Sequence, residues 1–83
     1  MDQTLSYLRE VLSNYTDRSD KAQSIHKKLM KNSFKSEGEF VRALTQEESM
    51  FLDGILPDEI NHANEVQDEK RAHELNEVYE LLF

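Results

Sequence analysis

Histidines are the residues of this sequence best suited to bind a metal ion or to transfer a proton near neutral pH. The three of them, His26, His62 and His73, lie far apart, and none stands in an H-E-x-x-H arrangement. A metal site would form only if the fold brought His62 and His73 together with a carboxylate such as Glu65. Because closed metal sites usually show local ligand spacing, we expect solvated histidines and no bound metal.

Carboxylates occur in adjacent pairs, which in some enzymes supply a general acid and a general base. Here each pair stands at the start of an expected helix, where acidic side chains interact favourably with the helix dipole. The pairs are Glu47-Glu48, Asp58-Glu59 and Asp68-Glu69. The sequence has no G-x-S-x-G motif, and its 2 glycines cannot form a glycine-rich phosphate loop. We therefore expect no catalytic residue, no cofactor and no enzyme activity.

A cluster of lysines could instead bind phosphate groups. It comprises Lys27, Lys28, Lys31 and Lys35. From Arg18 to Arg42 there are 7 basic residues against 3 acidic ones, a net charge of +4, whereas residues 45–83 hold 11 acidic residues against 2 basic ones, a net charge of −9. Such opposite fields can attract each other within the fold or steer a charged partner.

Two interpretations of this basic segment remain open. Beside the lysine cluster, Phe34 is the one candidate for base stacking, and the 3 acids in the segment oppose part of its charge. A solvated face, or internal pairing with the acidic half, therefore suits the composition better than a nucleic-acid site. The alternative is a nucleic-acid-associated protein that uses the Lys21 to Lys35 face, although tight binding of duplex DNA is not expected.

Composition predicts a small all-α protein. A chain of 83 residues has room for one core, so we expect a single helical domain over residues 1–83. Its single proline and 2 glycines leave little turn chemistry, and it has no cysteine for disulfides. We see no secretory signal and no apolar run that could span a bilayer, and we expect a cytoplasm-like location without membrane binding.

The elements that must position these residues are four or five short helices, ending in a helical hairpin. Leu5, Leu8 and Leu12 share one face of a first helix, and a basic helix follows Ser19. Boundaries are predicted near residues 16–19, 32–36, 44–45 and 67–68. Ser36 to Glu39 and Thr45 to Glu48 each have the form of a capping box, in which a hydroxyl and a glutamate satisfy backbone N–H groups reciprocally.

Apolar spacing continues from Gln46 through Pro57, so either a helix kinks at that proline or a new helix starts there. A last apolar stripe begins at Ala72. The residues expected to make most of the core are Leu5, Leu8, Leu12, Ile25, Leu29, Phe40, Leu52, Ile55, Leu75, Val78 and Leu82.

The apolar end of the sequence has two possible roles. Tyr79, Leu81, Leu82 and Phe83 cannot all lie on one helix stripe, so this segment either folds under another helix or contacts a partner. These four residues are our candidate partner surface, for an unknown protein or for a second copy of the chain.

Several segments together resemble one known family. They are Met1-Asp2, Thr4-Leu5, Tyr7-Leu8-Arg9-Glu10, Glu39-Phe40-Val41 and the closing block from Asp68 to Leu82, with Lys70-Arg71-Ala72 and Glu74-Leu75-Asn76-Glu77-Val78-Tyr79-Glu80-Leu81 inside it. These residues are similar to the small sporulation-specific proteins of endospore-forming bacteria, described as sigma-G-dependent and catalogued with the small acid-soluble spore proteins. The similarity covers nearly the whole chain.

This resemblance implies a time and a place: a protein made in the developing forespore and kept inside the spore. It brings no catalytic or ligand-binding residue with it. The glycine-rich spore proteins that coat DNA carry long motifs that this acidic chain lacks, so their DNA-protecting role does not transfer. We therefore expect a non-enzymatic sporulation protein that acts through protein–protein interaction.

Overall fold

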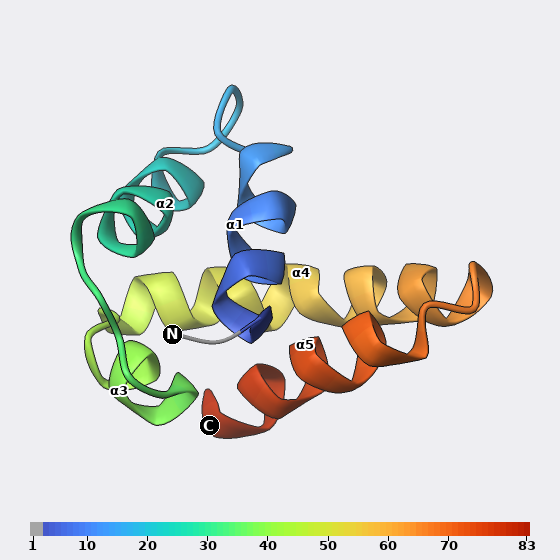
Figure 1. The fold of residues 1–83 in the computed structure, drawn as a ribbon. Helices are drawn as coiled ribbons and strands as arrows, with labels where there is room; N and C mark the ends of the chain where they lie inside the picture. Colours follow the sequence, from blue (N-terminus) through green and yellow to red (C-terminus); the bar gives the residue numbers. More distant parts are fainter. Residues whose placement is uncertain (1–2) are drawn as a thin grey trace.

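The computed structural model describes residues 3–83, and this part of the chain is helical, with no strand in it. The expectation of an all-α bundle is therefore confirmed. Figure 1 shows the five helices, which are α1 (Gln3–Ser13), α2 (Asp20–Lys31), α3 (Glu37–Arg42), α4 (Gln46–Glu65) and α5 (Glu69–Leu81).

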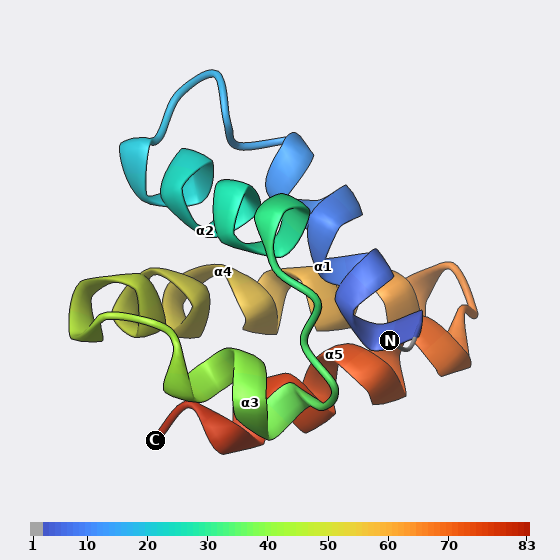
Figure 2. The same ribbon diagram turned by 60° about the vertical axis from the view of Figure 1, so that its left-hand side comes forward.

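The longest helix, α4, crosses the molecule, and α5 returns alongside it as the second arm of a hairpin (Figure 1). Helix α1 packs against α2 and α5, and α2 also packs on α4. The short helix α3 lies beside the end of α5, on the other side of α4 from α2 (Figure 2). Each helix thus buries one stripe against at least one neighbour, which is how short helices gain stability in water.

Polar side chains cap four of the helices where the sequence predicted boundaries. Ser19 accepts from the N–H of Ala22, Ser36 from Glu39, Thr45 from Glu48 and Asp68 from Arg71. The box that begins at Thr45 is complete, because the Glu48 carboxylate also accepts from the Thr45 N–H at 2.9 Å. At Ser36 only the hydroxyl half forms among the described contacts, so the predicted return bond from Glu39 was wrong.

Helix α4 continues through Pro57 without interruption, and the alternative in which a new helix starts at this proline is wrong. The helix instead ends in a turn in which Gln67 adopts a positive φ of 61°. The N–H of Asp68 donates to the carbonyl of Ala63 at 2.8 Å, and that of Gln67 to Asn64 at 3.1 Å. This bonding pattern is a Schellman motif, which usually has glycine at the left-handed position.

The core forms where the five helices meet, and it matches the sequence prediction at all but one position. Ile55 is only partly buried, while its neighbour Leu56 is completely inaccessible to solvent. The buried stripe of α4 runs through Ser49, Leu52, Leu56 and Ala63, and it leaves Ile55 at the edge. Buried apolar residues that the prediction omitted also include Val11, Ala22, Phe34 and Ala72.

Candidate interaction surfaces

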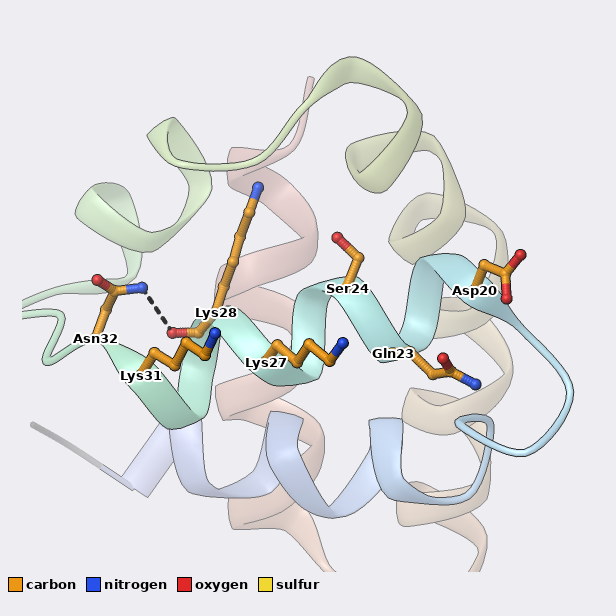
Figure 3. A pocket seen from close by; sticks show the side chains of 7 residues that line it. All are labelled: Asp20, Gln23, Ser24, Lys27, Lys28, Lys31 and Asn32. Atoms are coloured by element: carbon orange, nitrogen blue, oxygen red, sulfur yellow. Dashed lines mark hydrogen bonds between the residues drawn. The ribbon is translucent and has the colours of Figure 1, made fainter.

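The predicted lysine cluster divides into two groups on α2. Figure 3 shows Lys27 and Lys31 extending along the outer side of the helix, whereas Lys28 points away from them. Lys27, Lys31 and Lys35 are exposed. The spacing of four residues between Lys27 and Lys31 puts both ammonium groups on one helix face, where like charges repel each other slightly.

Lys28 belongs to a partly buried ion pair that joins α2 to α4. Its Nζ donates to the Glu48 carboxylate and, at 2.9 Å, to the carbonyl of Ala43. Glu48 is only 3% exposed and also accepts from the Ser24 hydroxyl and the Thr45 N–H. Burial acts to raise the pKa of Glu48, but the hydrogen bonds from Lys28, Ser24 and Thr45 outweigh it and hold the pKa below its ordinary value.

A second ion pair between the same helices lies at the surface. Lys21 Nζ stands 3.3 Å from the Glu47 carboxylate, and both side chains are largely in water. Internal pairing between the basic and acidic halves is therefore present at Lys21 and Lys28. Within residues 3–83, Lys27, Lys31 and Lys35 take part in no ion pair.

Two depressions near the exposed lysines lie along α2. One, of about 450 Å³, is lined by seven residues of α2 and its C-cap, Lys27 and Lys31 among them (Figure 3). The other, of about 220 Å³, lies between α1 and the end of α2, with Leu5, Leu29 and Phe34 in its wall and Arg9 and Met30 beside them. Asn32 lines both, so the two depressions adjoin.

The candidate partner surface at the end of α5 is divided by the fold. Leu82 is 7% exposed and belongs to the core, and Tyr79 is half-buried against it. Leu81 and Phe83 are 50% and 74% exposed. The structure therefore separates one anchoring residue from two apolar side chains that remain in contact with water.

The histidines lie on three different helices. His62 and His73 are exposed, and His73 Nε2 lies 2.8 Å from the Glu77 carboxylate one turn along α5. His26 is half-buried on α2. Residues 3–83 contain no group of three or more His, Asp or Glu side chains that could hold a metal ion. None of the described helices is long and apolar enough to cross a membrane.

One link that the sequence analysis missed is the contact of Arg71 with α1. Its guanidinium donates to Glu10 at 3.1 Å and to Asp68 at 3.2 Å, and it stacks 4.9 Å from the ring centroid of Tyr7. The hydrogen bond to Glu10 is the main reason why the pKa of Arg71 lies above its ordinary value. Glu10 and Arg71 are 61 positions apart, and no local sequence signal connects them.

Comparison with known proteins gives the chain its family. A sigma-G-dependent sporulation-specific SASP protein of Bacillus subtilis (strain 168) is 50% identical over 82 residues, which is 99% of this chain and 99% of the relative. The chain belongs to this family. A family model described as CsgA, minor curli fiber component A, also matches residues 1–83. No solved structure matches the chain.

The family membership agrees with the resemblance seen in the sequence and makes this chain a small sporulation-related protein. The descriptions of the relative and of the family model differ in kind, since one refers to a time in development and the other to a fibre. Neither names a catalytic activity or a ligand-binding residue. The surfaces on α2 and at the end of α5 are therefore the features from which a molecular role has to be argued.

Proposed function

We propose that this family member is a non-enzymatic forespore protein that acts by binding another protein, or a copy of itself, through the end of α5. The observation that carries the proposal is the alternation of burial there. Leu82 is fixed in the core at 7% exposure, while Leu81 and Phe83 on either side of it are 50% and 74% exposed.

This arrangement suits binding because the buried Leu82 anchors the backbone between the two exposed side chains. The buried Leu82 limits the freedom of its neighbours, so a partner that covers Leu81 and Phe83 loses less conformational entropy than it would on a mobile tail. Aromatic anchors supply much of the binding energy in protein interfaces, and full burial of one such side chain contributes about 1.5–3 kcal/mol.

The relatives support the setting of this proposal. The Bacillus subtilis relative is described as sporulation-specific and sigma-G-dependent, which favours a role inside the developing spore. The family description names a fibre component. Fibres that grow by strand pairing need an exposed strand edge, and the described residues form helices only. We therefore propose discrete helical contacts for this chain.

A nucleic-acid role on the Lys21 to Lys35 face is the second candidate. The exposed pair Lys27 and Lys31 beside an open depression favours it. Two of the lysines that would contribute, Lys21 and Lys28, are already engaged by carboxylates of α4. Since affinity for nucleic acid depends on the number of phosphates neutralised, the loss of these two weakens this candidate.

The test uses the intact chain and one double variant, L81E/F83E, compared with V66E. Val66 is a matched control because it is 59% exposed and lies in the turn at the opposite end of α5. Proteins retained by the wild-type chain from sporulating cells are purified, and their direct binding is measured by calorimetry. Circular dichroism and thermal melting establish that each variant is folded.

We expect L81E/F83E to weaken binding at least about tenfold, since two desolvated contacts are replaced by charges, whereas V66E binds like the wild type. Equal binding by L81E/F83E and the wild type would refute the role of α5. Turnover of a substrate by the purified chain would refute the non-enzymatic part of the proposal.

A further inference from the structure

Three side chains next to the adjoining depressions leave positive charge unpaired. Lys27 and Lys31 take part in no ion pair within the described chain, and Arg9 makes only a 3.8 Å contact with the sulfur of Met30. A thioether is a weak acceptor, whereas a guanidinium or ammonium group bonds a carboxylate strongly. We call Arg9, Lys27, Met30 and Lys31 the α1/α2 surface.

This surface combines positive charge with an apolar lining. The depression beside Arg9 has Leu5, Leu29 and Phe34 in its wall, and Met30 is 60% exposed at its edge. Methionine is a flexible and polarizable side chain that adapts to varied apolar partners. A ligand that fits here should therefore offer an apolar anchor with carboxylates on the same side.

The end of α5 has that composition. Glu77, Glu80 and Leu81 are spaced i, i+3 and i+4, which places them on one helix face, and the exposed Phe83 follows. Glu80 is exposed and is engaged by no described ion pair, and Glu77 contacts only the exposed His73. Two carboxylates and one apolar side chain thus share a helix face, and Phe83 lies at the same end of the chain.

The two complementary surfaces lie on different sides of the molecule. Figures 1 and 2 both place α2 above α4 and the end of α5 below it. One chain therefore does not bring its own α5 end to its own α1/α2 surface. Contact between the two surfaces requires two molecules, and because the surfaces differ, it is a head-to-tail contact.

We propose that the α5 end of one molecule docks on the α1/α2 surface of a second copy of this chain. Glu77 and Glu80 face Lys27, Lys31 and Arg9, while Leu81 and Phe83 pack near Met30. This assignment rests on the proposed function, since it names the partner of the same α5 end. It also accounts for the charges that remain after Lys21 and Lys28 have paired internally.

The net charge of the chain makes this contact selective. Each copy carries −7, so two copies repel unless the positive surface of one meets the negative end of the other. Complementary charges at an interface fix the orientation of the partners, and like charges placed opposite each other disfavour the other orientations. Head-to-tail contacts close into rings or extend as open chains, depending on the rotation between copies.

The experiment exchanges the charges on the two surfaces. Sedimentation velocity over a concentration series is recorded for the wild type, for K27E/K31E, for E77K/E80K and for an equimolar mixture of the two variants. We expect the wild type to associate and each variant alone to associate at least about tenfold more weakly. The mixture should associate again, because each reversed surface then finds a complementary one.

A wild-type chain that stays monomeric over the series overturns the proposal, and so does a mixture that fails to associate while both variants are folded. K27Q/K31Q, which removes charge without reversing it, replaces K27E/K31E if the reversal prevents folding. If the chain is monomeric but L81E/F83E still loses a purified spore partner, the proposed function stands and only the second copy as partner is refuted. If the charge variants associate like the wild type and L81E/F83E still binds the spore partner, both the second copy as partner and the proposed function are refuted.

Discussion

Removing the Glu48 carboxylate should destabilise the fold far more than removing its neighbour Glu47. Glu48 is 3% exposed and accepts from Lys28, Ser24 and the backbone N–H of Thr45. Glu47 makes only a surface ion pair with Lys21. Both residues lie in the first turn of α4, so the helix dipole acts on both, and they differ in burial and in the bonds they make.

The size of the effect follows from the contacts that are lost. A helix cap contributes about 1 kcal/mol, and a hydrogen bond to a charged group contributes about 1.5–3 kcal/mol. The Lys28 side chain is 28% exposed and can reach water after the carboxylate is removed. The loss of this hydrogen bond should therefore cost an energy near the lower end of that range. We therefore expect E48A to lower the free energy of unfolding by about 2–4 kcal/mol. E48Q can still cap the helix, so its loss should be about 1 kcal/mol smaller. E47A should lose about 0–1 kcal/mol, as exposed pairs do.

Chemical denaturation at several pH values checks this account. Because the pKa of Glu48 is lowered in the folded state, its contribution is fully present above the ordinary value of 4.5 and is lost as the pH falls through the lower folded value. The stability difference between the wild type and E48Q should therefore shrink below pH 4.5. Equal losses for E48A and E47A, or a difference that grows in acid, would refute the reasoning.

Three further outcomes are expected. Q67G should stabilise the chain by about 1 kcal/mol, because glycine adopts the positive φ of 61° without steric cost, and thermal melting should show a rise of about 4–8 °C; an unchanged midpoint would contradict this. L75A should lose about 2–5 kcal/mol in urea unfolding, whereas L81A, at a half-exposed position, should lose less than about 0.5 kcal/mol, and similar losses would show that the inner face of α5 is wrongly assigned. A salt titration should show duplex DNA binding weaker than about 10⁻⁸ M near 0.15 M salt, since Lys28 is withdrawn from the basic face; tighter binding would move the function to that face.

Helix boundaries could be predicted from the sequence because their signals are local. Ser19, Ser36, Thr45 and Asp68 each bond a backbone N–H three residues further on, so a short window contains both partners. The turn after α4 is different. Gln67 takes a conformation that usually selects glycine, and the hairpin around it holds it there, so residue preferences could not reveal its φ.

The choice between Ile55 and Leu56 shows where pattern analysis ends. Both are apolar, adjacent and compatible with helical spacing from Leu52. Which one is buried depends on how α4 is rotated against its neighbours, and that rotation is set by the packing of residues far away in the sequence. Leu56 is inaccessible to solvent, and Ile55 lies at the margin of the core.

Tertiary packing also decides which charged residues face solvent. It therefore changes how the separation of charge along the chain is interpreted. The net charge of the basic segment is +4, but this sum does not say which of its charges form ion pairs within the fold. Lys28 differs from Lys27 by one position, which is about 100° around the helix, and this rotation turns it toward Glu48. What remains for a partner is a smaller surface around Lys27, Lys31 and Arg9. A partner that recognises it must therefore supply few carboxylates in a fixed arrangement, as the end of α5 does, rather than an extended run of negative charge.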